Sequence, residues 1–154
     1  MKIKYLPFMI LSFGLLSCSQ KSEPNFSVMC EDLIKDIHLT FNFKDQEVDV
    51  RFVPKEFFRD AMRETSPQFK EDNGEQTFKH QITEHTGSYI KYVANPANIG
   101  EVTMKMDFTF NRVNMNLTTV TGFYNEDGSL GESPFEAVKQ NPVSLQQSCK
   151  KPIT

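Results

Sequence analysis

The chain has 154 residues, with 17 lysines and arginines against 20 aspartates and glutamates, and this length allows one domain of ordinary size and excludes two. Its 14 phenylalanines and 4 tyrosines can form a core, which argues against a disordered chain. The formal net charge of −3 argues against a nucleic-acid-binding protein, because such proteins need clustered basic side chains.

The first residues have the pattern of an export signal. Lys2 and Lys4 form a short positive region, and residues 5–16 are mostly apolar. This stretch is shorter than the about 20 apolar residues that a membrane-spanning helix requires. We therefore expect the apolar part of a signal peptide rather than a transmembrane helix.

The run Leu15-Leu16-Ser17-Cys18 follows this stretch and resembles the lipobox of bacterial lipoproteins. The resemblance implies cleavage after Ser17 and attachment of fatty acyl chains, such as palmitate, to Cys18. Two or three chains, at about 0.8 kcal/mol per buried CH₂, anchor a protein stably. Ser19, rather than an aspartate, follows the cysteine, and this resembles the sorting pattern of outer-membrane lipoproteins. The resemblance implies an anchor in the outer membrane, with the protein facing the periplasm. The alternative is an ordinary secretory peptide with an incidental cysteine.

These features divide the chain into a signal peptide, 1–17, a lipidated cysteine with its tether, 18–25, and a single folded domain, 26–154. The tether is polar and contains Pro24. At about 3.5 Å per residue it reaches at most about 25 Å. We therefore expect the folded domain to work close to the bilayer.

Two cysteines remain once Cys18 carries lipid, and they lie at opposite ends of the domain. Exported proteins usually oxidise such a pair, so we expect a disulfide between Cys30 and Cys149. Closing a loop of about 118 residues should stabilise the fold by about 4 to 5 kcal/mol. A metal site is less favoured, because neither residue lies in a Cys-x-x-Cys pair or near a histidine.

The first part of the domain predicts a helix followed by a hairpin. In residues 26–36 the apolar side chains recur at intervals of three and four, which is typical of an amphipathic helix. Apolar and polar residues then alternate over 37–43 and 48–52, which indicates two strands. With residues 44–47 as the loop, Phe43 is expected opposite Val48, and all apolar residues share one face.

The middle of the domain predicts an inserted helix and a second hairpin. Pro54 suits the first turn of a short helix that ends near Glu64. Strands are expected at 76–83 and 88–94, with no clear choice of core face, and a turn is expected at 95–98.

The clearest alternation in the chain predicts a third hairpin over residues 101–124. With residues 111–114 as its loop, Phe110 is expected opposite Met115. The stretch Ser133-Pro134-Phe135-Glu136 has the spacing of a capping box with proline at the first helical position, which predicts a short C-terminal helix.

Together these elements predict an α+β fold. It consists of an antiparallel sheet of about six strands in three hairpins, an N-terminal helix, one inserted helix and a short C-terminal helix.

Motifs of the common hydrolase and nucleotide-binding classes are absent from the sequence. The three histidines are isolated along the chain, so the sequence favours a non-enzymatic protein without a cofactor. A hydrolase whose site is assembled only by folding is the alternative, and it requires His80 or His85 to meet an acid or a hydroxyl group.

A soft-metal carrier is a second alternative. Met104 and Met106 share one strand face, and with an imidazole from His80 or His85 they would suit Cu(I). The stretch 102–108 is similar to the Met-x-Met strand of periplasmic copper and silver chaperones, which resemble a small barrel with a tryptophan over the metal. This chain has no tryptophan, and core packing explains both methionines as well.

The favoured interpretation is a binding or interaction domain with a protein partner in the envelope. Strict alternation cannot place every aromatic residue of the strands in the core, and exposed aromatics often mark a partner surface. The residues expected in that surface are Tyr89, Tyr92, Phe123 and Tyr124. Inhibitor, immunity or envelope-assembly roles all fit this interpretation.

Overall fold

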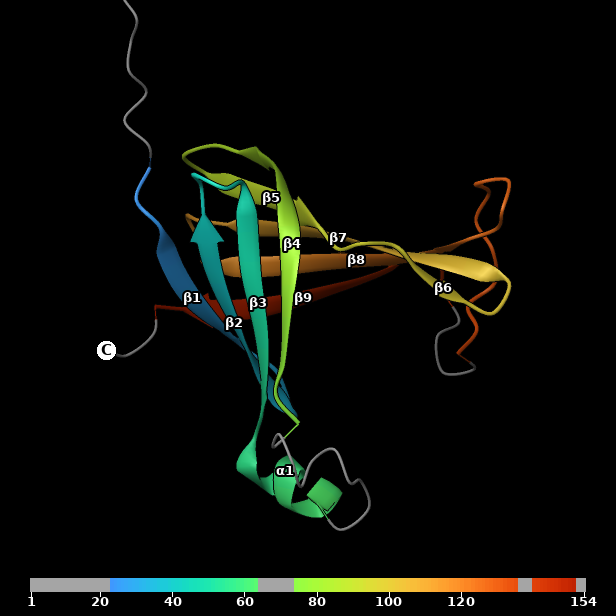
Figure 1. Ribbon diagram of the computed structural model, residues 1–154, viewed down its shortest axis with the longest axis horizontal. Helices are drawn as coiled ribbons and strands as arrows, with labels where there is room; N and C mark the ends of the chain where they lie inside the picture. The colour runs from blue at the N-terminus through green and yellow to red at the C-terminus, as the bar shows by residue number, and fades with distance from the viewer. Residues whose placement is uncertain (1–22, 64–73, 136–139, 152–154) are drawn as a thin grey trace, which may run out of the picture.

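The structure is a computed structural model that describes residues 23–63, 74–135 and 140–151 (Figure 1). Within these ranges the chain forms nine strands and one short helix. They are β1 (Phe26–Glu31), β2 (Lys35–Asn42), β3 (Glu47–Pro54), α1 (Glu56–Arg63), β4 (Gln76–His85), β5 (Tyr89–Val93), β6 (Ala97–Ile99), β7 (Val102–Asn111), β8 (Asn116–Tyr124) and β9 (Val143–Lys150). No helix of this described part is long and apolar enough to cross a membrane.

Eight of the strands close into an antiparallel barrel in the order β1-β2-β3-β4-β5-β7-β8-β9. The ring closes where β9 pairs with β1, and β6 is an extra strand that pairs with β7 beyond the end of β5. In Figure 1 the β7–β8 hairpin therefore extends past the barrel toward β6. The expected α+β fold with about six strands is wrong, because the domain is almost entirely β.

The helix expected over residues 26–36 is wrong, because β1 and the start of β2 occupy this stretch. Its apolar residues also fit an alternating pattern: Val28 and Cys30 are buried, whereas Leu33 is 87% exposed. The backbone of β1 bonds to β2 on one side and to β9 on the other. The pairing with β9 joins residues more than 100 positions apart, so it competes with a helix in a way that local spacing does not reveal.

The C-terminal helix is also wrong in its described part. Residues 134 and 135 form a bend, in which the Phe135 N–H donates to Ser133 Oγ at 3.2 Å, and residues 136–139 lie outside the described ranges. The segment after Pro142 is strand β9. It pairs with β8 over six residue positions and supplies the last strand of the barrel.

The hairpins β2–β3 and β7–β8 are present, but each register differs by two residues from the expected one. Phe41, not Phe43, lies opposite Val48, and Phe110 lies opposite Leu117. The observed loops, 43–46 and 112–115, each lie one residue from the expected position, and each ends at a residue with φ of 56°, Gln46 or Met115. A shift of two leaves every side chain on its expected face.

The remaining expected elements are close to the observed ones. Helix α1 lies within the predicted inserted helix, and β4 and β5 occupy the second predicted hairpin. Their inward residues, undecided from the sequence, include Ile82, Ile90 and Tyr92, which are buried. The turn expected at 95–98 is shorter, because Ala97 already begins β6.

One end of the barrel is filled by aromatic side chains. The Phe41 ring lies 4.8 Å from Phe26 and 5.3 Å from Phe110. The Arg112 guanidinium lies 5.1 Å from the Phe26 ring centre and pairs with the Glu23 carboxylate. Chain segment 23–26 therefore enters the domain at this closed end.

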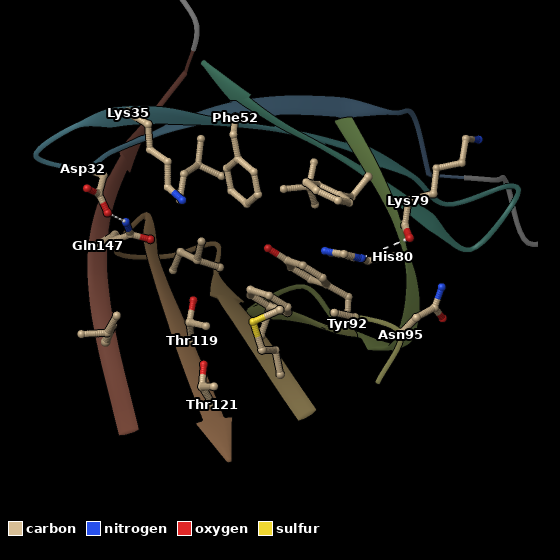
Figure 2. A pocket seen from close by; sticks show the side chains of 18 of the residues that line it. Asp32, Lys35, Phe52, Lys79, His80, Tyr92, Asn95, Thr119, Thr121 and Gln147 are labelled. Carbon is tan, nitrogen blue, oxygen red and sulfur yellow. Dashed lines mark hydrogen bonds between the residues drawn. The ribbon is translucent and has the colours of Figure 1, made fainter. Parts of the chain in front are cut away.

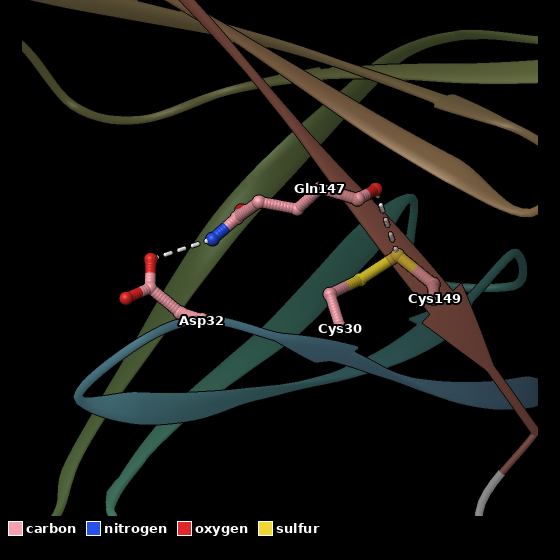
Figure 3. Close-up of a disulfide and its surroundings, with 4 residues drawn as sticks. All are labelled: Cys30, Asp32, Gln147 and Cys149. Atoms are coloured by element: carbon pink, nitrogen blue, oxygen red, sulfur yellow. Dashed lines mark hydrogen bonds between the residues drawn. A yellow bond between two sulfur atoms is a disulfide. The ribbon is translucent and has the colours of Figure 1, made fainter.

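A disulfide joins Cys30 of β1 to Cys149 of β9, the pair singled out from the sequence (Figure 3). The Cα atoms lie 3.9 Å apart and face each other in the register. The β1–β9 ladder has only two register pairs, which makes it the shortest in the ring. The covalent bond thus lies at the seam with the fewest register pairs.

Candidate ligand cavity at the open end of the barrel

The half of the barrel away from the phenylalanine cluster contains a cavity of about 790 Å³ (Figure 2). The buried residues Ile37, Val50, Tyr92 and Leu117 belong both to the core and to the cavity lining, so they form its floor. Drug-sized ligands occupy cavities of about 300–1,000 Å³. The cavity is therefore large enough for a small organic molecule.

The alternation of the strands explains which side chains line the walls. On β7 the inward residues Met104, Met106 and Phe108 line the cavity, while Lys105 and Asp107 between them are exposed. The same alternation continues on the neighbouring strands. Their inward lining residues are Thr119 and Thr121 on β8, and Leu145 and Gln147 on β9.

Flat aromatic surfaces make up much of the wall that β3, β4, β5 and β7 form. The Tyr92 ring stacks on Phe108 with centres 4.7 Å apart and planes 3° apart, and His80 lies 5.5 Å from Phe108. Phe52 and Phe78 lie 5.6 Å apart. These surfaces provide apolar contact area for a ligand, with few polar groups to set its orientation.

Lys35 is a charged residue at an inward position. It precedes Ile37 by two residues on β2, and its side chain turns into the cavity, with Nζ 4.1 Å from the Phe52 ring centre (Figure 2). Among the described residues, no carboxylate lies within ion-pair distance of this ammonium. The nearby Asp32 carboxylate instead accepts a hydrogen bond from Gln147 Nε2 at 2.8 Å.

The Tyr92 hydroxyl points into the cavity but has no hydrogen-bond partner in the described part of the chain (Figure 2). Its side chain is 1% exposed, and burial raises the pKa of the phenol far above its usual value. The hydroxyl therefore stays protonated at any physiological pH. An unpaired buried hydroxyl typically costs about 1–3 kcal/mol.

His80 presents one ring nitrogen to the cavity and has the other engaged. Its Nδ1–H donates to the Lys79 carbonyl oxygen at 3.1 Å, since a carbonyl can only accept. Burial lowers the pKa of the imidazole, so the neutral form dominates at neutral pH. In that form Nε2 carries no proton and can accept a hydrogen bond or bind a metal.

The residues of the soft-metal hypothesis come together in this structure, since His80, Met104 and Met106 all line the cavity. No cluster of three or more His, Cys, Asp or Glu side chains suited to a metal ion occurs in the described ranges. Any metal held here would therefore depend on the two thioethers.

The expected aromatic partner surface is wrong, because two of its four residues are inside the protein. Tyr92 is 1% exposed and Phe123 is 2% exposed. The Tyr89 hydroxyl donates a hydrogen bond to the Glu84 carboxylate. The Tyr124 ring contacts Lys105, whose Nζ lies 4.8 Å from the ring centre. Closure of the barrel turns the Tyr92 face of β5 inward, whereas Phe123 is covered by Phe135, with ring centres 5.9 Å apart.

The histidines of the hydrolase hypothesis lie in different places. His80 is in the cavity, whereas His85 is at the closed end, with Nδ1 3.8 Å from the Glu23 carboxylate. Neither ring is hydrogen-bonded to a hydroxyl group within the described residues. Cys18, the predicted lipidation site, lies outside the described ranges.

Sequence reasoning missed Lys35 and Phe52 as site residues. The predicted alternating series begins at Ile37. Lys35 lies two residues earlier, so its side chain has the same orientation as that of Ile37. The available signal was the position of this lysine, which continues the alternating series of inward apolar residues on β2. The cavity itself has no local signal, because its lining residues come from strands far apart in the sequence, which meet only when the barrel closes.

Comparison of the chain with protein-family models, with curated proteins and with solved structures gives no match.

Proposed function

We propose that the protein is a non-enzymatic binding lipoprotein of the bacterial envelope, which carries a small, mostly apolar ligand in the open end of its barrel. The observation that carries this proposal is the 790 Å³ cavity with apolar and aromatic walls. Eight-stranded barrels have an interior that can be filled by side chains or can hold one small ligand. In this barrel the side chains fill only the half that contains the phenylalanine cluster.

The position of the cavity fits a protein held at its N-terminus. Glu23, the first described residue, pairs with Arg112, so the described chain begins at the closed end. The cavity occupies the opposite half of the barrel. A lipid on Cys18 would then leave the open end facing away from the bilayer, where a ligand can enter.

The test is binding of N-phenyl-1-naphthylamine, a neutral apolar dye, to the full-length protein in nanodiscs, with empty nanodiscs as the blank. Thr119 faces the cavity, whereas its neighbour Thr118 has the opposite orientation on the same strand. Thr119→Phe should fill the cavity, and Thr118→Phe is the matched control. We expect one dye molecule per protein, with affinity lowered at least tenfold in Thr119→Phe only.

Two results would overturn the proposal. One is dye binding no greater than the blank. The other is equal binding by the two phenylalanine variants, which would place the dye elsewhere on the surface.

The anchor is tested separately by detergent phase partitioning. The parent protein should enter the detergent phase, and Cys18→Ala should remain in the aqueous phase. Equal partitioning of both proteins would contradict lipid attachment at this cysteine.

A soft-metal carrier is the second candidate, favoured by the shared location of His80, Met104 and Met106. The fixed Nδ1–H of His80 leaves Nε2 free for a metal, an arrangement common among metal-binding histidines. A carrier would retain one equivalent of Cu(I) against bicinchoninate, and a Met104→Leu, Met106→Leu double variant would lose it. No retention by the parent would exclude this candidate.

A further inference from the structure

We infer that the ligand is a monocarboxylic acid with an apolar body, whose carboxylate binds between Lys35 Nζ and Tyr92 Oη in the barrel. This inference rests on the proposed function, that the barrel holds an apolar ligand. It adds the chemistry of the ligand's polar group and the two side chains that recognise it.

The first observation is the charge of Lys35. A lysine near the mouth of a barrel can extend its ammonium into water, as long charged side chains usually do. This one turns inward, over the Phe52 ring, where no carboxylate of the described residues neutralises it. An anionic group in the cavity would provide the missing counter-charge.

The second observation is independent and concerns Tyr92. Its hydroxyl is buried, protonated and without a hydrogen-bond partner among the described residues, and it points toward the same space as the Lys35 ammonium (Figure 2). Its free proton requires an acceptor. A carboxylate offers two oxygens, so it can accept from Tyr92 and from Lys35 together.

Other polar groups on the ligand satisfy the site less well. An alcohol could accept from Tyr92 but would leave the charge of Lys35 without a partner. An amine would add a second positive charge. A dianion is disfavoured because Asp32 also lines the cavity, and its carboxylate is held there by Gln147 Nε2 and by the Ile34 N–H.

The remaining charged group at this wall does not compete for the ligand. Lys79 Nζ lies 2.8 Å from the Glu47 carboxylate and 3.8 Å from Asp49, both on β3. Figure 2 shows the Lys79 side chain directed away from Tyr92 and His80. Lys35 therefore remains the cation available to a carboxylate inside the cavity.

The experiment compares three probes of equal length, decanoate, decanol and decylamine, by displacement of N-phenyl-1-naphthylamine from the full-length protein in nanodiscs at pH 7.5. We expect decanoate to bind at least tenfold more tightly than decanol, and decylamine to bind most weakly. In Lys35→Met the preference for decanoate should fall to less than threefold, while decanol binds as before. Lys35→Arg should retain the preference.

The matched control is Lys105→Met. Lys105 also lies over an aromatic ring, at 4.8 Å from the Tyr124 centre, but on an exposed position of β7. The Lys105→Met variant should leave the affinities for decanoate, decanol and decylamine unchanged. Tyr92→Phe should weaken decanoate binding several-fold without affecting decanol, because it removes one hydrogen-bond donor and little volume.

The outcomes separate this inference from the function on which it rests. Equal binding of decanoate and decanol by the parent, or an unchanged preference in Lys35→Met, would overturn the carboxylate inference and leave the apolar cavity standing. Failure of the dye and of all three probes to bind would instead overturn the proposed function. A Tyr92→Phe variant that binds decanoate like the parent would remove Tyr92 from the site.

Discussion

Removal of the Cys30–Cys149 disulfide should have the largest effect on stability of any single change at the barrel seam. The two cysteines are 119 residues apart, and the loop-entropy relation gives about 5 kcal/mol for a loop of this length. Domains of this size are stable by about 5–15 kcal/mol. The β1–β9 ladder has only two register pairs to compensate for the loss.

The double variant Cys30→Ala, Cys149→Ala removes the disulfide and leaves no unpaired thiol at the seam. Urea unfolding followed by circular dichroism should give a free energy of unfolding lower by about 4–5 kcal/mol, and a Tm lower by roughly 15–20 °C. The parent measured in reductant should show a similar loss. A decrease of less than about 1 kcal/mol in the free energy of unfolding would show that the seam holds without the covalent bond, contrary to this prediction.

Three further changes follow from single side chains. Tyr92→Phe should raise the free energy of unfolding of the ligand-free protein by about 1 kcal/mol, because it removes an unpaired buried hydroxyl; a destabilised variant in urea unfolding would contradict this. Burial lowers the pKa of His80 in the folded state, so the unfolded chain takes up the proton first. The Tm should therefore fall as the pH drops below 6.5, the ordinary histidine value, and His80→Asn should show a smaller fall; an equal fall would assign the effect to other groups. Arg112→Met should lower the free energy of unfolding by about 1–3 kcal/mol, because Arg112 donates to the Thr86 carbonyl at 3.0 Å and pairs with Glu23; no change in urea unfolding would show that this end is held by its phenylalanines alone.

The strands with clear alternation were predictable from the sequence, and their pairing partners less so. The inward faces of β2, β3, β7 and β8 follow from a period of two, which is a local property. The registers of both hairpins differ by two residues from the expected ones, because Gln46 and Met115 adopt positive φ and set where each loop ends. Neither residue is one that usually signals such a turn.

The closure of the barrel was not predictable from local pattern. Residues 26–36 fit both a helical and an alternating spacing, and the choice depends on β9, which lies more than 100 residues further along the chain. Once the sheet closes, one face becomes interior. This explains why Tyr92 is buried rather than exposed, and why Lys35 points into a cavity. Phe123 is buried for another reason, because it packs against Phe135 with ring centres 5.9 Å apart.

The soft-metal residues illustrate the same limit for the site. The alternation of the sequence predicts that Met104 and Met106 share one face, but it leaves open whether His80 or His85 lies near them. The structure brings both methionines and His80 to one cavity, together with Lys35 and the Tyr92 hydroxyl, which no spacing in the sequence connects.

The most direct test of the ligand cavity is the NMR spectrum of the full-length protein with ¹³C-labelled methionine methyl groups, titrated with decanoate. Met104 and Met106 line the cavity, whereas Met115 packs against the core at the end of the β7–β8 loop. We expect the Met104 and Met106 signals to shift and to saturate at one ligand per protein, while the Met115 signal stays in place. Unchanged Met104 and Met106 signals, or equal shifts at all three residues, would contradict a ligand site in the open end of the barrel.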